Sequence, residues 1–321
     1  MNVLILSART GWHTDELCRA LAVRGFAGRV MPYERLVARI GSTVGALHVA
    51  PAEPPGESGP DSGETSVFDA DAVLARIIPD GSLEQIIYRV DALHWIEDRG
   101  VPVMNPARAI ERAVDKFYTT ALLQEAGLPT PETVVCETAA EAMAAIAAML
   151  RDGAEVVIKP LFGSMGHGLV RLGDTELAWR VVRTLTQMKS VLYVQRAIDH
   201  GGRDVRAFVV GSRVLAAIER QAPPDEWRTN VAVGGSARPI ELPAVWEQVA
   251  IRAARAVGAE YAGVDLIQSR AGELFVLEVN AIPGWQGLQR ATGVDVAAAI
   301  VDHLADRVAA RRGVAGVAGA P

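Results

Sequence analysis

The chain has 321 residues, with 32 Lys and Arg against 38 Asp and Glu, and a formal net charge of -6. Half of the residues are apolar, which excludes a chain that is disordered throughout. The mild acidity argues against a nucleic-acid-binding protein, which carries a clustered basic surface, and aromatic residues at 5% argue against a base-stacking platform.

The cysteine count and the apolar segments limit the class of protein further. Two cysteines, Cys18 and Cys136, are too few for a disulfide framework or a four-thiolate zinc site. The apolar start at residues 1–6 is too short for a signal-peptide core, and no later stretch reaches the ~18 uncharged apolar residues of a membrane span. We therefore expect a soluble, cytoplasmic protein with neither a nucleic-acid nor a membrane partner.

The first part of the chain predicts an open α/β layer. Residues 3–6 read as a buried strand, a helix follows over about 14–24, and a second strand and helix are predicted from about 71 and over 82–99. Residues 51–66 are rich in Pro, Gly, Ser and Glu and predict an exposed, flexible loop. The sequence has neither a dinucleotide-binding fingerprint nor a Walker loop, so a conventional NAD or P-loop site is unsupported.

Helices are predicted over 107–113, 115–126 and 137–150. A glycine-rich segment follows between two apolar runs. Backbone N–H groups of such a loop can surround an anion, and a lysine at the end of the preceding strand adds positive charge beside it. A glycine-rich hairpin with a surface lysine is the alternative. The segment contains Lys159, Gly163, Ser164, Gly166, His167 and Gly168.

An apolar strand at 191–195 ends in polar residues. Gln195 is followed by Arg196, Ala197 and Ile198, where a bend offers free backbone N–H and C=O groups that could read a purine edge. An ordinary strand end is the alternative interpretation.

A β-hairpin with charged residues comes next. Gly211-Ser212 between two β-branched runs is a two-residue hairpin signal. Asp204 and Arg206 then lie on one face of the first strand, and Arg220 lies at the end of its partner. These charged groups either pair with one another or line a polar cleft, because unpaired burial would be costly.

A short polar segment precedes the last predicted sheet strands. Arg228, Thr229 and Asn230 stand before Gly234-Gly235, and Arg228 can hold a phosphate or a carboxylate bidentately. An ordinary loop is the alternative.

The sharpest signal is a second predicted hairpin, folded near Ala271-Gly272. Glu278 and Asn280 alternate with apolar residues and share a face, and the hairpin brings Asp265 opposite them. Two carboxylates on an apolar face repel each other unless a cation lies between them, and an all-oxygen set favours Mg²⁺ or Mn²⁺. A protonated or arginine-paired carboxylate pair is the alternative.

The order of these motifs resembles the ATP-grasp superfamily and, within it, the RimK-type ligases that add glutamate or a similar amino acid to a carboxylate. The resemblance covers about residues 70–308. It rests on Val114-Asp115-Lys116, Leu128-Pro129-Thr130-Pro131, the segment 159–168, Gly202-Arg203-Asp204-Val205-Arg206, Arg228-Thr229-Asn230, Gly263-Val264-Asp265, Leu277-Glu278-Val279-Asn280 and Pro283-Gly284.

The resemblance implies a mixed α/β and α+β fold, in which two α+β subdomains clamp ATP behind an N-terminal α/β pre-grasp domain. The implied divisions are 1–104 for the pre-grasp domain, 105–190 for the small subdomain with the glycine loop, 191–308 for the subdomain with the metal site, and 309–321 for a disordered tail.

The resemblance also implies residue roles. Lys116 and Lys159 would contact phosphates, and the glycine loop would close over the triphosphate. The backbone at Arg196 and Ala197 would read the adenine, and Asp204 the ribose region. The remaining residues assigned to the nucleotide are Gln195, Ile198, Arg206 and Thr229; those assigned to catalysis are Arg228, Asn230 and Arg220; Asp265, Glu278 and Asn280 would hold two Mg²⁺ ions.

Three positions depart from the family pattern. Arg196 stands where relatives usually carry Glu, Trp227 precedes Arg228 where Phe is usual, and His167 lies inside the glycine loop. These departures affect the fine geometry around the nucleotide and leave the class unchanged.

The implied activity is ATP-dependent joining of a carboxylate to an amine through an acyl phosphate. The expected partners are ATP, an amino acid such as glutamate, and a carboxylate on a small molecule such as a pterin or on a protein C-terminus. Such ligases are commonly oligomers, so assembly of identical chains is one expectation. An ATP-grasp kinase acting on a hydroxyl and a non-catalytic nucleotide-binding module are the alternatives.

Overall fold

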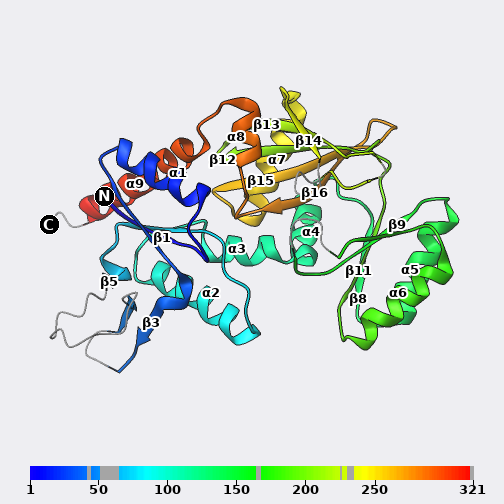
Figure 1. Ribbon diagram of the computed structural model, residues 1–321, viewed down its shortest axis with the longest axis horizontal. Coiled ribbons are helices and arrows are strands. Elements are labelled where there is room, and N and C mark those ends of the chain that lie inside the picture. Colours follow the sequence, from blue (N-terminus) through cyan, green and yellow to red (C-terminus); the bar gives the residue numbers. More distant parts are fainter. Residues whose placement is uncertain (42–44, 51–64, 164–167, 225, 230–234, 319–321) are drawn as a thin grey trace.

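The computed structural model describes residues 1–321 except 42–44, 51–64, 164–167, 225, 230–234 and 319–321. The described strands form four sheets, which lie in three regions along the long axis of the molecule (Figure 1). The N-terminal sheets lie at one end, a five-stranded sheet lies in the middle, and a smaller sheet with two helices forms the other end. No helix in the described residues is both long and apolar enough to cross a membrane.

A parallel four-stranded sheet forms the N-terminal end. Alternate residues of its first strand enter two different cores: Val3 and Ile5 pack with Leu17, while Leu4 and Leu6 pack with Leu93. Both faces of the sheet are therefore covered, as the continuous apolar strand predicts. The sheet has the order β2-β1-β6-β7, with β1 (Asn2–Leu6), α1 (Trp12–Val23), β2 (Ala27–Met31), β6 (Ala72–Ala75), α2 (Leu83–Asp98) and β7 (Val103–Met104).

A small antiparallel sheet lies beside it, built from β3 (Leu36–Arg39), β4 (Ala46–Val49) and β5 (Thr65–Ser66). Two short 3-10 helices flank these strands, Tyr33–Arg35 and Val67–Asp69. The last two residues of the expected loop 51–66 thus form a strand instead, because Thr65 and Ser66 pair with β4. Residues 51–64 lie outside the described residues.

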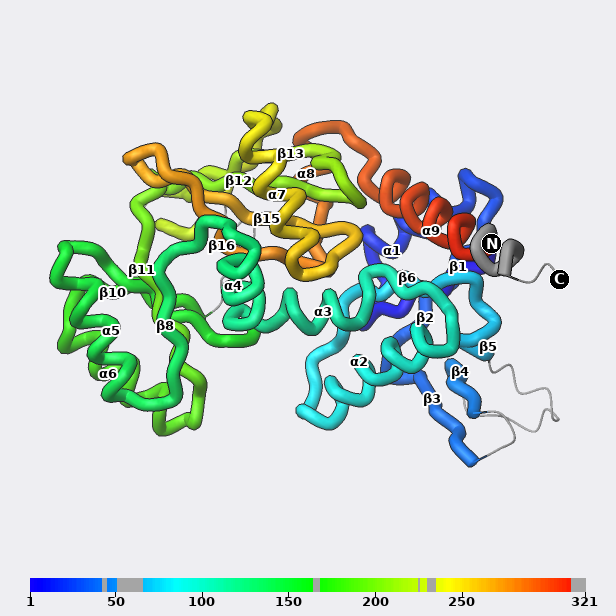
Figure 2. Tube along the Cα trace, turned by 180° about the vertical axis from the view of Figure 1, so that it is seen from behind, coloured from blue at the N-terminus to red at the C-terminus, as the bar shows by residue number. Residues whose placement is uncertain are grey.

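The far end of the molecule is an antiparallel sheet with its own core. Helices α5 and α6 lie side by side along these strands (Figure 2). Their buried side chains, among them Ile146 and Val182, share one core with side chains of the strands. The strand order is β10-β9-β11-β8, with β8 (Thr133–Cys136), α5 (Ala139–Arg151), β9 (Val156–Lys159), β10 (Val170–Leu172), α6 (Thr175–Gln187) and β11 (Leu192–Arg196). Because β11 pairs with β8 and β9, this sheet continues to Arg196, past the division expected at residue 190.

The central sheet is antiparallel and contains both predicted hairpins. Its order is β14-β13-β12-β15-β16, with β12 (Arg203–Val210), β13 (Arg213–Gln221), β14 (Ser236–Pro239), α7 (Ala244–Val257), β15 (Tyr261–Gln268) and β16 (Leu274–Asn280). Two helices that precede the small sheet in sequence, α3 (Ala107–Val114) and α4 (Lys116–Glu125), contact α7 and β16. The region expected to belong to the small subdomain therefore begins with helices that pack on the central sheet.

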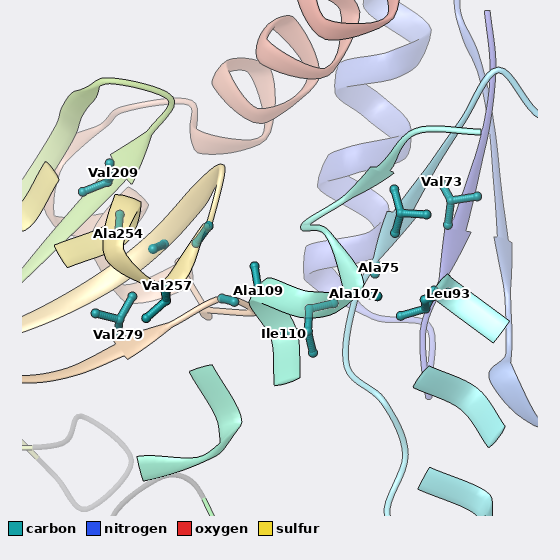
Figure 3. Close-up of a cluster of buried hydrophobic side chains, with 14 of the residues drawn as sticks. Val73, Ala75, Leu93, Ala107, Ala109, Ile110, Val209, Ala254, Val257 and Val279 are labelled. Carbon is teal, nitrogen blue, oxygen red and sulfur yellow. The ribbon is translucent and has the colours of Figure 1, made fainter. Parts of the chain in front are cut away.

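A continuous core joins the N-terminal sheet to the central sheet. Figure 3 shows Val73 and Ala75 of β6 on one side, Ile110 of α3 between, and Val279 of β16 on the other side. Full burial of a valine, leucine or isoleucine side chain contributes about 1.5–3 kcal/mol to the free energy of folding. The N-terminal sheet is thereby fixed against the strand that carries Glu278 and Asn280.

The C-terminal helices close the N-terminal end of the molecule. After α8 (Gln286–Thr292), helix α9 runs from Val296 to Ala318 and contacts α1. The expectation of a disordered tail from residue 309 is therefore wrong as far as Ala318. Alanine is the best helix former, and each residue added to an existing helix adds one hydrogen bond. The glycines in the last part of α9 are therefore tolerated.

Candidate functional site

A pocket that is open to solvent lies between the small sheet and the central sheet. Most described residues of the predicted site line it: Lys116, Lys159, Gly163, Gln195, Arg196, Ala197, Ile198, Asp204, Arg220, Arg228, Thr229, Asp265 and Glu278. Gly168, Arg206 and Asn280 are described but do not line it, and Ser164, Gly166, His167 and Asn230 lie outside the described residues. Motifs far apart in the sequence thus meet in one place.

Sequence reasoning missed the apolar walls of this pocket. Val157 of β9 and Leu169 come from the small-sheet side, and Ile267 of β15 and Leu277 of β16 come from the central sheet. Such a slot accepts a flat ring between apolar side chains. The signal was present in the strand alternation, since Leu277 precedes Glu278, but apolar strand residues read first as core.

Lys159 ends β9 and points across the small sheet. Its Nζ donates to Oε1 of Gln195 at 2.6 Å, and Gln195 in turn donates from Nε2 to the hydroxyls of Thr133 at 2.9 Å and Tyr193 at 3.1 Å. Removal from water lowers the pKa of Lys159 to about 8, partly opposed by the charge of Glu278. Gln195 is almost completely buried and orients the lysine.

Lys116 approaches the pocket from the start of a helix. Asp115 caps α4 by accepting from the backbone N–H of Tyr118 at 3.0 Å, which places Lys116 in the first turn. Its Nζ donates to the carbonyl oxygen of Gly163 at 2.8 Å, and burial lowers its pKa. Lys116 therefore holds the entry of the glycine loop, whose flanking Gly163 and Gly168 have φ of 136° and 74°, a region that favours glycine.

The bend after β11 differs from the expectation in one respect. The backbone N–H of Arg196 donates to the carbonyl of Glu132, and that of Ala197 donates to the carbonyl of Glu155, both at 2.8 Å. These two N–H groups are therefore not free to read a purine. The Arg196 guanidinium pairs with Glu132 at 2.8 Å and Asp152 at 3.1 Å, which accounts for an arginine at this position.

A chain of alternating charges crosses the central sheet. Arg220 of β13 pairs with Asp204 of β12 through Nε at 2.7 Å and reaches Asp265 of β15 at 3.0 Å. Arg206 holds the same Asp265 with two hydrogen bonds of 2.7 and 2.6 Å and lies 3.9 Å from Glu278. Burial alone would raise the pKa of Asp265, but the two arginines lower it to about 2. Asp265 is thus an ionised carboxylate that is paired with arginines. The alternative interpretation of the sequence, an arginine-paired carboxylate pair, therefore holds for Asp265.

The three oxygen-bearing residues converge as the second hairpin predicts. Asp265 lies directly opposite Glu278 across β15 and β16, and Asn280 lies opposite Gly263. Nδ2 of Asn280 donates to Oε1 of Glu278 at 2.8 Å, which ties the amide to the carboxylate. The Glu278 side chain is 41% exposed and that of Asp265 is 5% exposed.

These residues fit a divalent cation that arrives with a polyphosphate. Among the described residues, no group of three or more His, Cys, Asp or Glu forms a metal cage. Mg²⁺ typically binds one or two carboxylates together with substrate phosphates, which Asp265 and Glu278 can supply. The pocket also places more cationic than anionic side chains on its wall, which suits a polyanion: Lys116, Lys159, Arg171, Arg196, Arg220 and Arg228 against Asp204, Asp265 and Glu278.

Arg228 and Thr229 lie at one wall of the pocket. The Arg228 guanidinium pairs with Glu226 at 2.6 Å, and the backbone N–H groups of Trp227 and Arg228 donate to the same carboxylate. The side-chain hydrogen bond from Arg228 lowers the pKa of Glu226 to about 2. Arg171 lies 5.9 Å from the centre of the Trp227 ring, so this segment is linked to β10 of the small sheet.

The fold, with a pocket between the small sheet and the central sheet, is the fold of solved ATP-grasp ligases. Solved structures share the fold: the ATP-grasp ligase PsnB complexed with minimal precursor has a TM-score of 0.73 at 20% identity and covers 95% of this chain and 98% of its own. A RimK domain protein of Sphaerobacter thermophilus has a TM-score of 0.67 at 24% identity, with 94% and 99% covered.

The family model of the RimK-like ATP-grasp domain matches residues 113–304, and the chain belongs to this family. It is 32% identical to the tetrahydromethanopterin:alpha-L-glutamate ligase of Methanococcus maripaludis, over 94% of this chain and 97% of that protein. It is 38% identical to a probable alpha-L-glutamate ligase of Trichodesmium erythraeum, over 73% and 76%. The chain is an ATP-dependent ligase that joins a carboxylate to an amine, which excludes the binding module and leaves the kinase without support.

Proposed function

We propose that the chain is a Mg²⁺-dependent ligase that adds L-glutamate to the carboxylate of a small molecule of the pterin class. The observation that carries the proposal is that one pocket brings Lys116 and Lys159 to the face of Asp265 and Glu278. Relatives named tetrahydromethanopterin:alpha-L-glutamate ligase, in Methanosarcina acetivorans and Methanococcus maripaludis, support the choice of both substrates.

The nucleotide is proposed to lie along the pocket. Val157, Leu169, Ile267 and Leu277 would enclose the adenine, and Asp204 would lie toward the ribose. Lys116 and Lys159 would contact the phosphates. The ammonium group of lysine is a compact positive charge with rotatable donors, so it can follow a phosphate oxygen that moves during the reaction more easily than a planar guanidinium can. The glycine loop that begins at Gly163 would cover the triphosphate and exclude water.

Asp265, Glu278 and Asn280 would hold Mg²⁺, with Mn²⁺ as a substitute. When bound, the ion neutralises the charge on the transferring phosphoryl group. Arg206 and Arg220 keep Asp265 ionised and fix the direction of its oxygens. Arg228, which lines the pocket, would contact the reacting phosphate. The same role is proposed for Asn230, which lies outside the described residues.

The chemistry follows from the poor leaving group of a carboxylate. Transfer of the γ-phosphoryl group to a carboxylate oxygen breaks the bond to ADP and forms an acyl phosphate. The amine of glutamate then attacks the acyl carbon, the tetrahedral intermediate collapses, and phosphate leaves with the bonding electron pair. The amine loses one proton to solvent or a base. The protein positions the reactants and neutralises charge.

The substrate assignment is tested by mass spectrometry of the reaction products. The purified chain is incubated with ATP, Mg²⁺, L-glutamate and tetrahydromethanopterin, and in parallel with a peptide that ends in a free carboxylate. We expect a glutamylated pterin and ADP formation that depends on both acid and amino acid. Glutamylation of the peptide alone would overturn the pterin assignment, and a stable phosphate ester would overturn the ligase assignment. We also propose a cytoplasmic location, where ATP is available.

A further inference from the structure

Arg76, which directly follows β6 of the N-terminal sheet, is a buried cation outside the pocket. Its residue is 2% exposed, and among the described residues it forms no ion pair. Burial of a charge without an ionised partner is costly, so the polar contacts that compensate for it are informative.

Within the described part of the chain, the hydrogen bonds of the Arg76 side chain go to residues in the region of the central sheet. One terminal nitrogen donates to the hydroxyl of Tyr261 at 3.1 Å, and the other donates to the carbonyl of Pro283 at 3.1 Å. The guanidinium also lies 4.6 Å from the centre of the Trp285 ring, a cation–π distance. Arg76 therefore connects the first residue of β15 to the segment that follows β16.

These are the two strands of the proposed metal face. Asp265 lies on β15, four residues after Tyr261, and Asn280 ends β16, three residues before Pro283. Pro283 packs directly on Gly263: a Cβ at Gly263 would lie 3.0 Å from Cβ of Pro283. Gly263 is in turn the register partner of Asn280. A shift of the Pro283 segment would therefore displace Gly263 and, through it, the residues of the proposed metal face.

Two other side chains hold the same points. Nδ2 of Asn105 donates to the carbonyl of Tyr261 at 2.7 Å and also to that of Ala281. Nε2 of His13 accepts the backbone N–H of Trp285 at 3.1 Å. Burial, together with the charge of Arg76, lowers the pKa of His13 to about 4, so the ring is neutral and can accept this bond.

We propose that Arg76 is a positioning residue for the metal site, and that it fixes the spacing of β15 and β16 by holding Tyr261 and Pro283 from the N-terminal sheet. The inference rests on the proposed function, because it requires Asp265, Glu278 and Asn280 to hold Mg²⁺. It assigns the N-terminal part of the chain a role in catalysis at a distance from the nucleotide. Residues that orient metal ligands typically change metal affinity or activity by about 10–100-fold when removed.

The test measures ADP binding by titration calorimetry at increasing Mg²⁺ concentration, in the full-length protein without acid or amino acid. Arg76→Met removes the charge and both hydrogen bonds, and Arg76→Lys keeps the charge and one of them. The matched control is Arg89→Met: Arg89 is also a buried arginine of the N-terminal part, 5% exposed, and donates to the carbonyl of Pro79 at 2.7 Å.

We expect the Mg²⁺ concentration that half-saturates the effect on ADP binding to rise about tenfold or more in Arg76→Met. Arg76→Lys should lie between Arg76→Met and the wild type, and Arg89→Met should match the wild type. ADP affinity without Mg²⁺ should be the same in all four proteins. The lysine variant carries the test if Arg76→Met does not fold.

Two results would overturn the inference alone: a Mg²⁺ dependence of the Arg76 variants equal to that of Arg89→Met, or an equal loss of ADP binding with and without Mg²⁺. If wild-type ADP binding does not respond to Mg²⁺, the proposed metal site fails and the inference fails with it. The failure of the inference and the failure of the proposed function are thus distinguishable.

Discussion

At the scale of single residues, the buried network around Asp265 combines structural and chemical roles in one carboxylate. Its oxygens accept hydrogen bonds from Arg206 and Arg220, and its side chain is 5% exposed. Glu278, opposite Asp265, is 41% exposed and lies 3.9 Å from Arg206, so it contributes less to the stability of the fold than Asp265 does. The two carboxylates should therefore separate loss of activity from loss of stability.

Asp265→Asn should lose turnover by about a thousandfold, since metal charge stabilisation contributes several kcal/mol. It should also lower the free energy of unfolding by about 3–5 kcal/mol, because the half-buried Arg206 loses the carboxylate that it holds with two hydrogen bonds and the buried Arg220 keeps only Asp204 as an ionised partner. Glu278→Gln is the matched variant and should lose turnover with little change in stability. Urea unfolding and steady-state ADP formation measure the two effects. Equal stability of both variants would contradict the structural role of Asp265.

The depressed pKa of Lys159 predicts a pH dependence of nucleotide binding. With a pKa of about 8, the amine is protonated and attracts phosphates below that pH and is neutral above it. ADP affinity in the wild type should therefore fall as the pH rises from 7 to 9.5. Lys159→Met should bind ADP weakly without this dependence. Titration calorimetry across the pH range checks this, and a wild-type affinity that rises toward pH 9.5 would contradict it.

The sequence predicted much of the site at the residue scale and missed part of it. Alternation along 274–280 was enough to place Glu278 and Asn280 on one face, since a strand has a period of two. No sequence motif surrounds Arg76, so its role could not be predicted. That role depends on a hydrogen bond to Pro283, more than 200 positions away in the sequence. Such long-range contacts have no local signature.

At the scale of elements, the two hairpins of the central sheet were predictable and the ends of other elements were not. Gly211-Ser212 separates β12 from β13, and the turn at Ala271-Gly272 separates β15 from β16, as expected from turn chemistry. The pairing of β11 with β8 and β9 was not predictable, because the partners are distant in sequence. Helix α9 extends into a segment whose glycines suggested disorder.

The close contact between β15 and the segment after β16 gives a prediction at this scale. Gly263→Ala introduces a Cβ 3.0 Å from Pro283 and 3.5 Å from Nε of Arg206. Neighbours must shift, so we expect a stability loss of about 1–3 kcal/mol and weaker Mg²⁺ dependence of ADP binding.

Gly287→Ala is the matched control for this substitution. Gly287 lies in α8 with open space around its Cβ position, and this variant should be neutral or slightly more stable. Thermal unfolding of both variants provides the comparison. A Gly263→Ala protein as stable as Gly287→Ala would show that the two strands do not need this close approach.

At the scale of the whole molecule, a shared core and a few buried polar contacts fix the N-terminal sheet to the central sheet. The small sheet has a separate core, and the pocket lies between it and the central sheet. The class of fold followed from the order of motifs in the sequence. The packing of α3 and α4 on the central sheet depended on tertiary contacts that no motif carries.

His13 gives this interface a pH dependence. Its pKa is about 4 in the folded protein and about 6.5 when unfolded, so the unfolded state binds more protons between these values. Stability from this residue is therefore full above about pH 6.5 and decreases as the pH falls toward 4. His13→Asn should lack this part of the dependence. Urea unfolding at pH 4.5, 5.5 and 7 checks it, and identical pH profiles of wild type and variant would contradict it.

The most direct test of the account follows oxygen from the acid substrate. The carboxylate of the proposed pterin acceptor is labelled with ¹⁸O, and the phosphate released with ATP, Mg²⁺ and glutamate is analysed by mass spectrometry. An acyl phosphate transfers an acid oxygen to phosphate, so we expect ¹⁸O in the inorganic phosphate and none in the nucleotide. Label in AMP, or unlabelled phosphate alongside a glutamylated product, would contradict the mechanism.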